Sequence, residues 1–409
     1  MALKKCKQEG FAMLYNSFQN LRLSALGFGT MRLPTLPDGE IDQAQLDKMV
    51  DLAMAEGVNY FDTAYPYHNG KSELAVGRSL ARYPRASWYL ADKFPGHQNV
   101  AGVRQMQPED IFEQQLKKCG VDYFDFYLLH NVNENSMCYY GNSENRYMEY
   151  FLEQKAKGRI KHLGFSTHGA PECIERFLER WGEHLEFCQI QLNYVDWTLQ
   201  DAEKKCEILK KAGIPVWVME PVRGGKLARF DAAIEEKLRA ARPDESIPAW
   251  AFRWLRTVPK PTMILSGMSN LAQMEDNLKT FREDRPLSEA ELGLLDEARE
   301  SLAAMIPCTA CRYCCEGCPM GLDIPSMLAM ANDMAVSASF TTVARYTALG
   351  DGKRASDCIG CGQCAQACPQ KIDVPDALQK LAALMAGQKT WEEICKEREK
   401  AADALRNKA

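Results

Sequence analysis

The first three hundred residues alternate short apolar runs with amphipathic stretches. Runs this short, bounded by polar residues or glycine, are typical of buried strands. They fall at residues 23–30, 58–64, 87–93, 124–130, 160–166, 187–194, 214–220 and 262–268. Between them lie helical patterns such as 41–57 and 108–120, which end in Gly57 and Gly120, a residue suited to a helix C-terminus. A strand followed by a helix, repeated eight times, predicts an α/β fold of the (β/α)8 barrel type.

The pattern after the last strand is helical and then changes. Residues 287–305 are predicted to form a helix, with a capping box of Ser288 and Glu291 and a staple between Leu287 and Leu292. We expect the barrel to occupy residues 1–300, a smaller, mainly helical domain to occupy 301–386, and a charged helix to follow at 387–409.

The smaller domain is marked by the spacing C-x2-C-x2-C-x3-C-P, which occurs twice. The eight cysteines are Cys308, Cys311, Cys314, Cys318, Cys358, Cys361, Cys364 and Cys368. Each run continues with Asp, an aliphatic residue and Pro, where a helix is expected to begin. Tetrahedral zinc sites come as separated pairs of ligands and fit this spacing less well.

This spacing resembles the ligand runs of bacterial ferredoxins that hold two iron-sulfur clusters. The resemblance implies two [4Fe-4S] clusters, because the fourth cysteine of each run reaches the other cluster. One cluster would take Cys308, Cys311, Cys314 and Cys368 as ligands. The other would take Cys358, Cys361, Cys364 and Cys318.

Composition narrows the classes of partner. With 50 basic and 55 acidic residues the formal charge is −5, so nothing favours nucleic acid or an anionic membrane. The N-terminus lacks the apolar stretch of a signal peptide, and no run approaches the roughly eighteen apolar residues of a spanning helix. We therefore expect a cytoplasmic protein, a setting in which clustered thiols are more often metal ligands than disulfides.

Four polar residues stand at or just after the ends of consecutive predicted strands, where barrels carry their chemistry. They are Asp62, Tyr67, Lys93 and His130. A tyrosine can donate a proton if a nearby ammonium stabilises its phenolate, and a carboxylate can keep that lysine charged. The histidine would orient the oxygen that is protonated. The four types fit one task, proton donation to an oxygen.

The motifs "FDTA" with Tyr67 beyond it, "ADK" and "DFYLLH" resemble the catalytic tetrad of the aldo-keto reductases, over residues 15–300. The resemblance implies hydride transfer from NADP(H), with NAD(H) as the alternative coenzyme, to a small-molecule carbonyl compound. It also implies coenzyme contacts at Thr30, Met31, Asp62, Ser166, Gln191, Met219, Pro221, Val222, Gly224, Gly225, Ser269, Gln273, Asp276 and Asn277. Three positions depart from the family pattern: Met219 replaces a stacking tyrosine, Gln273 an arginine for the 2'-phosphate, and Thr167 an asparagine.

An aromatic-rich segment, 131–150, follows His130. Its side chains and others after the strands could line a pocket for a hydrophobic or ring-bearing substrate: Tyr139, Tyr140, His97, Phe94, Tyr65 and Trp197.

The role of the clusters stays open at this point. Nicotinamide transfers two electrons as hydride, whereas a cluster takes one, and no flavin signature joins the two. The clusters could exchange electrons with a flavoprotein or a redox-active substrate, sense redox state, or stabilise the fold. A second function is also open, in which the barrel is a nicotinamide-binding sensor or an electron-transfer subunit that docks a flavoprotein. The tetrad argues against it, because a sensor has no need of Tyr67 as an acid.

Overall fold

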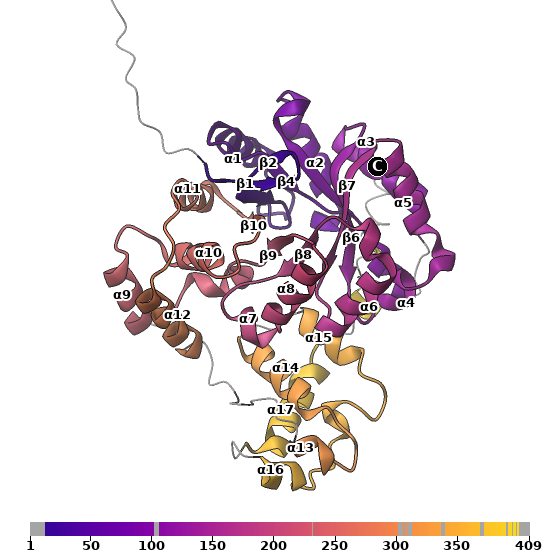
Figure 1. The fold of residues 1–409 in the computed structure, drawn as a ribbon, viewed down its shortest axis with the longest axis vertical. Helices are drawn as coiled ribbons and strands as arrows, with labels where there is room; N and C mark the ends of the chain where they lie inside the picture. The colour runs from indigo at the N-terminus through magenta and orange to yellow at the C-terminus, as the bar shows by residue number, and fades with distance from the viewer. Residues whose placement is uncertain are drawn as a thin grey trace, which may run out of the picture.

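Eight parallel strands close into a barrel, as the hydrophobic pattern predicts (Figure 1). The computed structural model describes residues 13–101, 106–230, 232–301, 306, 308, 313–336, 340–368, 372–389, 392–394, 396, 397, 399 and 400. In the order in which they pair around the barrel, the strands are β10 (Met263–Gly267), β3 (Leu26–Gly29), β4 (Tyr60–Asp62), β5 (Tyr89–Phe94), β6 (Phe124–Val132), β7 (Ile160–Thr167), β8 (Cys188–Gln191) and β9 (Val216–Met219). Each overlaps a predicted strand.

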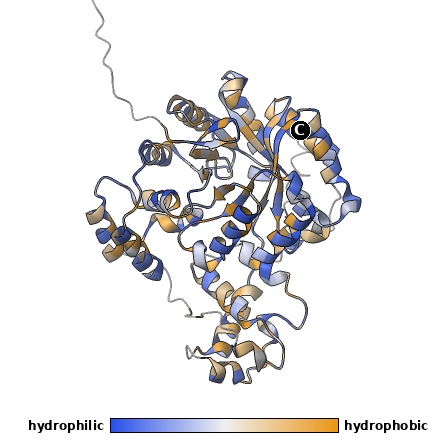
Figure 2. Ribbon diagram, in the orientation of Figure 1, coloured by the Kyte–Doolittle hydropathy of each residue, from blue (hydrophilic) through white to orange (hydrophobic). Residues whose placement is uncertain are grey.

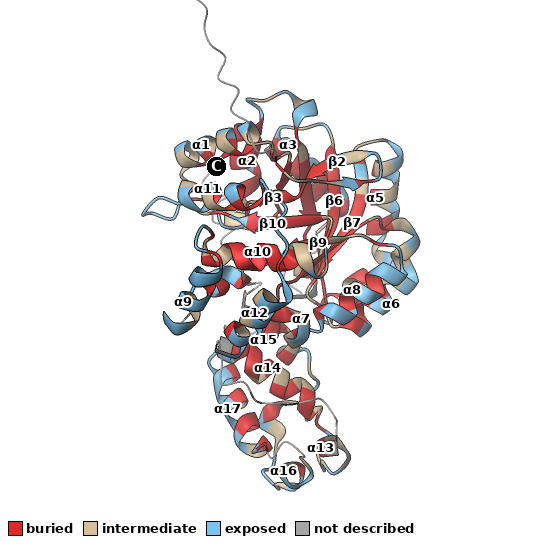
Figure 3. Ribbon diagram, turned by 60° about the vertical axis from the view of Figure 1, so that its left-hand side comes forward, coloured by how far each residue is buried: buried red, intermediate tan, exposed pale blue. Residues whose placement is uncertain are grey.

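Helices surround the barrel and alternate with the strands along the chain. They are α1 (Gln43–Ala55), α2 (Ser72–Leu80), α3 (Pro108–Cys119), α4 (Met137–Tyr140), α5 (Tyr147–Ala156), α6 (Pro171–Trp181), α7 (Asp196–Leu199), α8 (Ala202–Lys211), α9 (Ala232–Ala241), α10 (Ile247–Thr257), α11 (Leu271–Thr280) and α12 (Glu289–Ser301). In Figure 2 many of these helices carry both hydrophobic and hydrophilic residues, as expected of helices that bury one face against a sheet. Figure 3 shows the barrel strands and α10 as mostly buried.

The helix ends follow the predicted signals. The backbone at Gly57 and Gly120 has φ of 90° and 65°, a left-handed conformation that glycine adopts without a Cβ clash. The capping box of α12 is present, since Ser288 N donates to Glu291 Oε2 at 2.7 Å and Glu291 N donates to Ser288 Oγ at 3.4 Å. These ends set where each chain segment enters the next strand.

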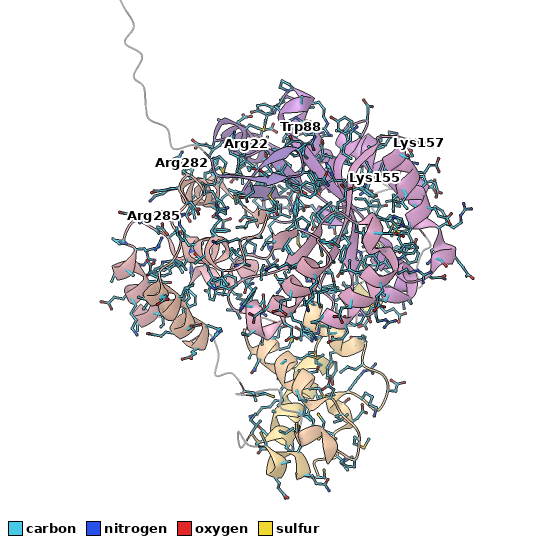
Figure 4. The ribbon with its side chains drawn as sticks, viewed as in Figure 1. Arg22, Trp88, Lys155, Lys157, Arg282 and Arg285 are labelled. Carbon is cyan, nitrogen blue, oxygen red and sulfur yellow. The ribbon has the colours of Figure 1, made fainter. Side chains whose placement is uncertain are left out.

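A short hairpin that the sequence pattern did not predict closes one end of the barrel. It consists of β1 (Tyr15–Phe18) and β2 (Leu21–Ser24), which pair antiparallel. Phe18 and Leu23 belong to the cluster of buried side chains inside the barrel, and the Phe18 ring lies 5.0 Å from that of Trp217. Arg22 and Trp88 mark this end of the molecule in Figure 4. The barrel is therefore filled at the end where the hairpin lies, and its opposite mouth is left for a site.

The C-terminal part is helical, as predicted, and has its own buried core. Its helices are α13 (Tyr313–Glu316), α14 (Ile324–Val336), α15 (Phe340–Thr347), α16 (Gln363–Ala367) and α17 (Val374–Ala386). We call residues 306–389 the module. The ends of α12 and α17 lie beside the boundaries predicted at 300 and 386, whereas the end of the predicted charged helix, 401–409, lies outside the described residues.

An ion pair and a hydrogen bond connect the module to the barrel. Arg223, after β9, forms a buried ion pair with Asp333 on α14, and Asn135 Nδ2 donates to the Ala344 carbonyl oxygen of α15 at 2.9 Å. In Figure 1, α14 and α15 lie next to α7 and α8. Within the part of the chain that the structure describes, no helix is both long and apolar enough to cross a membrane.

Candidate active site

A cavity of about 730 Å³ opens at the carboxyl ends of the barrel strands, the place where barrels of this type carry their chemistry. Three of the four residues predicted to be catalytic line it: Asp62, Tyr67 and His130. Lys93 lies behind them and is fully buried. The structure thus brings the four side chains to one mouth.

Local structure fixes each member of this group. Asp62 is the last residue of β4, Lys93 lies in β5 and His130 lies in β6, so neighbouring strands present all three. Tyr67 follows β4 in a turn whose next residue, His68, has φ of 50° and accepts a hydrogen bond from Leu33 N at 2.9 Å. The turn is held in a left-handed conformation that costs free energy, a feature common where a side chain must be aimed.

Lys93 is the centre of the group. Its Nζ donates to Asp62 Oδ1 and, at 2.6 Å, to the Thr63 carbonyl oxygen, and it lies 5.0 Å from the centroid of the Tyr67 ring. The His130 ring meets that of Tyr67 edge-on at 5.9 Å. Tyr67 therefore lies within reach of an ammonium on one side and an imidazole on the other.

The surroundings set the protonation of each group. Burial opposes the charge of Lys93, but Asp62 and Tyr67 more than offset it and raise the pKa of the lysine. Burial also raises the pKa of Tyr67, and the Lys93 charge lowers it only part of the way back. Tyr67 consequently holds its proton at neutral pH, beside a charge that would stabilise its phenolate once the proton has left.

All the residues predicted to contact coenzyme line the same cavity: Thr30, Met31, Asp62, Ser166, Gln191, Met219, Pro221, Val222, Gly224, Gly225, Ser269, Gln273, Asp276 and Asn277. Several are held by neighbours. Gln191 Nε2 donates to Asp196 Oδ2 at 2.8 Å, and Ser166 Oγ accepts from Asn131 N at 2.9 Å. They therefore share one surface of the cavity.

The two ends of this surface differ in character. The loop after β9 carries Gly224 and Gly225 at φ of 63° and 91°, and a Cβ added to Gly225 would meet open space. Such a loop leaves backbone accessible to a ligand. At the other end, Gln273 Oε1 accepts from Ser269 N at 2.8 Å at the start of α11, so its side chain orders the turn there.

The prediction of an aromatic lining was mostly wrong. Of the six aromatic and histidine side chains proposed, His97 lines the cavity, with its ring 4.8 Å from that of His130. The others pack elsewhere: the Tyr140 hydroxyl donates to the His130 carbonyl oxygen at 2.9 Å, and the rings of Tyr139 and Trp197 lie against Phe94 and Trp254. The Lys118 ammonium covers the ring of Tyr65. The number of aromatic residues in a segment does not show whether their rings line a cavity or pack in the core.

Several lining residues were not predicted from the sequence. Arg32 and Glu220 form an ion pair of 2.8 Å between the loops after β3 and β9, and Arg223 and His168 also line the cavity. Arg32 could have been found from its place directly after Thr30 and Met31 in "GTMR". Phe340 and Thr341 complete the lining and come from α15 of the module.

The module has a second, smaller cavity among its cysteines. Cys318, Cys358, Cys361 and Cys364 line it together with apolar side chains. This is the set of four that the ferredoxin resemblance assigns to one cluster, including the cysteine from the other run. Within the described residues, no three His, Cys, Asp or Glu side chains lie close enough to hold a metal ion. The residue types and their neighbourhood nevertheless fit one cluster site. Cys311 lies outside the described residues.

Comparison with known proteins identifies the family of each part of the chain. The sequence profile of the aldo/keto reductase family matches residues 25–300. The chain belongs to the aldo/keto reductase family. A second profile, that of the 4Fe-4S dicluster domain, matches residues 307–372. The chain is therefore an aldo/keto reductase that carries a dicluster ferredoxin domain, and its fold and oxidoreductase class follow.

Individual relatives resemble the reductase part. The NADH-specific methylglyoxal reductase of Escherichia coli (strain K12) is 25% identical over 329 residues, which cover 69% of this chain and 97% of that protein. The L-galactose dehydrogenase of Arabidopsis thaliana is 24% identical over 285 residues, covering 64% of this chain and 86% of the relative. Among solved structures, the holo form of an aldo-keto reductase from Bacillus halodurans is similar in fold, with a TM-score of 0.55, 22% identity, and coverage of 70% of this chain and 96% of that one.

Proposed function

We propose that this aldo/keto reductase reduces a small-molecule aldehyde or ketone with a nicotinamide coenzyme, and that Tyr67 is the general acid. The observation that carries the proposal is the convergence of Tyr67, Lys93, Asp62 and His130 at one cavity mouth. A bound nicotinamide would supply hydride to the carbonyl carbon. The roles that remain belong to side chains of this chain.

Tyr67 donates its hydroxyl proton to the carbonyl oxygen as that oxygen gains negative charge. The Lys93 ammonium stabilises the phenolate that is left, and Asp62 keeps Lys93 charged and in place. His130 lies edge-on to the Tyr67 ring and orients the carbonyl oxygen. In the reverse reaction Tyr67 takes the proton back.

The residues that line the cavity fit a nicotinamide coenzyme. Asp62 Oδ2 is buried and has no hydrogen-bond partner in the described structure, and the open backbone at Gly225 suits a phosphate. Among the described residues lining the cavity, the arginines are Arg32 and Arg223, and each is paired with a carboxylate. Gln273 carries no charge that could hold the 2'-phosphate of NADPH. We therefore propose that NADH serves at least as well as NADPH. The Escherichia coli relative is named as NADH-specific.

We further propose that the module holds two [4Fe-4S] clusters on the eight cysteines of its two runs. The dicluster match and the cavity that joins Cys318 to Cys358, Cys361 and Cys364 support this. Bound clusters would supply single-electron transfer. A flavoprotein or a redox-active substrate is the partner of matching chemistry, because a flavin exchanges both single electrons and hydride.

The role of Tyr67 as general acid can be tested with the variant Tyr67→Phe, purified with its clusters intact. The substitution removes only the hydroxyl group and keeps the ring. We therefore expect kcat for aldehyde reduction to fall by about 10²–10⁴-fold, while the Kd for coenzyme stays within a factor of about two. Initial rates and fluorescence titrations should be run with both NADH and NADPH. Unchanged turnover would contradict the mechanism, and loss of coenzyme binding would point to a structural role for the hydroxyl.

The second function, a nicotinamide sensor or electron-transfer subunit, makes a different prediction. Under anaerobic conditions NADH or NADPH, together with a flavoprotein that divides the hydride into single electrons, would then reduce the clusters, as followed by visible absorbance and electron paramagnetic resonance. Carbonyl turnover without cluster reduction would leave the reductase function and assign the clusters to a partner or to the fold.

A further inference from the structure

The wall of the catalytic cavity is not made by the barrel alone. Phe340 and Thr341, at the start of α15, line the cavity that also holds Tyr67 and His130. Thr341 is buried and Phe340 is half-buried. The ferredoxin domain therefore contributes side chains to the reductase site.

The position of α15 places these two residues beside the carbonyl end of the cavity. Asn135, which bonds to Ala344 of α15, lies in the loop that follows β6 and His130. The Arg345 charge acts on Glu172 of α6 and Lys205 of α8, both on the side of β7 and β8. The aldo-keto reductase resemblance implies that the adenosine part of the coenzyme lies at residues 269–277. These residues follow β10, which stands opposite β6 in the ring of strands. Phe340 and Thr341 are thus on the side of substrate rather than of adenosine.

A chain of buried polar contacts fixes α14, and with it α15, to the coenzyme surface. Asp333 of α14 accepts from Arg223, whose Nε donates to Asp196 Oδ1 at 3.1 Å. Asp196 in turn accepts from Gln191, which lines the cavity. Breaking such buried pairs is costly, so the module is held in one position against the site.

We propose that Phe340 and Thr341 are specificity-determining residues, which limit the size of the group that a carbonyl substrate can place between His130 and α15. The matching substrates are aldehydes or ketones with a small apolar group, packed against the Phe340 ring. This inference rests on the proposed carbonyl reduction and adds to it: the ferredoxin domain selects the substrate of the barrel.

The test is Phe340→Ala in the full chain, purified anaerobically. A small and a bulky aldehyde, acetaldehyde and 2-naphthaldehyde, are compared with the same coenzyme. Removing the ring opens space at the wall, so the ratio of kcat/KM for the bulky over the small aldehyde should rise about tenfold or more. Coenzyme Kd and the visible absorbance of the clusters should not change. Thr341→Ala, which shortens the neighbouring wall residue, should raise the ratio in the same direction but by less.

Leu384→Ala is the matched control, because Leu384 is an exposed apolar residue on α17 of the same domain. An unchanged ratio in Phe340→Ala, with coenzyme Kd and clusters intact, would overturn the inference. If the wild type reduces neither aldehyde, the proposed function fails, and calorimetric binding of the two aldehydes to coenzyme-loaded protein decides the inference alone. Tighter binding of 2-naphthaldehyde by Phe340→Ala than by the wild type would support it, and equal binding would contradict it.

Discussion

Two buried lysines near the cavity show how partners decide protonation at the scale of single residues. Lys93 has Asp62 in direct contact, and its pKa is raised despite full burial. Lys205, on α8, is also buried, but burial and the Arg345 charge lower its pKa to about 8. The first lysine is kept charged, while the second carries a charge at neutral pH that its surroundings oppose.

Lys205 should therefore destabilise the folded chain in a pH-dependent way. Below pH 8 both the folded and the unfolded state bind the proton, and the folded state bears the full cost, at most about 3 kcal/mol. Between pH 8 and 10.5 the folded state alone releases the proton, so the stability of the wild type rises. Lys205→Met should accordingly stabilise the protein at pH 7 and lose that advantage as the pH approaches 10.5.

Denaturant midpoints followed by tryptophan fluorescence at pH 7 and pH 10 would measure this difference. Lys211→Met, an exposed position on the same helix, is the control and should change neither midpoint. An equal gain for Lys205→Met at both pH values would show that the effect comes from packing instead of charge.

At the scale of residues, the sequence predicted which side chains meet in the site when those residues lie at or just after the end of a strand. Tyr67, Lys93, Asp62 and His130 could be predicted to meet because parallel strands bring their carboxyl ends to one mouth. Phe340 could not be predicted, since its contact with the cavity depends on how a separate domain is seated.

At the scale of elements, the packing of α2 against α3 supports the tetrad. Helix α2 follows the turn that carries Tyr67, and α3 follows the strand that carries Lys93. The two helices approach closely at Gly77, where an added Cβ would lie 2.4 Å from the Cys119 carbonyl oxygen. Backbone on one side cannot yield to a side chain on the other.

Gly77→Ala should therefore destabilise the protein by about 1–3 kcal/mol, because the two helices must separate. Gly293→Ala is the matched control: its Cβ would meet nothing within 4 Å on α12, and helix propensity favours alanine there by roughly 0.5–1 kcal/mol. Thermal unfolding by circular dichroism should show shifts of opposite sign. Shifts of the same sign would contradict the close-approach argument.

The barrel strands could be predicted from apolar runs, because strands buried on both faces are continuously hydrophobic. The β1–β2 hairpin could not, since it buries only side chains such as Phe18 and Leu23 while its other face is polar. The prediction that the aromatic segment after His130 lines the cavity was wrong for a related reason. Whether the aromatic side chains of α4 face the cavity or pack against the barrel depends on packing, not on composition.

At the scale of the whole molecule, the Arg223–Asp333 pair joins the two domains. Both side chains are buried, and Arg223 also bonds to Asp196. Removing the Asp333 carboxylate leaves part of the guanidinium unpaired at the junction of the domains. Breaking a buried pair in this way costs about 3–5 kcal/mol.

Asp333→Ala should consequently loosen the module without unfolding the barrel. Hydrogen exchange should become faster by tenfold or more in α14 and α15, and little altered in β3 to β10. Asp351→Ala removes a fully exposed carboxylate paired with Arg354 in the same domain and should have no such effect. Unchanged exchange in α15 of Asp333→Ala would show that other contacts hold the domains together.

The cysteine cavity has a consequence for the order in which the molecule is assembled. Cys318 and Cys358 both line it, and the segment between them contains α14 and α15. A metal centre held there would tie the two ends of that segment and reduce the chain entropy lost when α15 settles against the barrel. Iron delivery would then be a maturation step for the reductase itself. A chain made during iron shortage could bind coenzyme in its folded barrel, yet still lack the α15 side chains in the wall of the catalytic cavity.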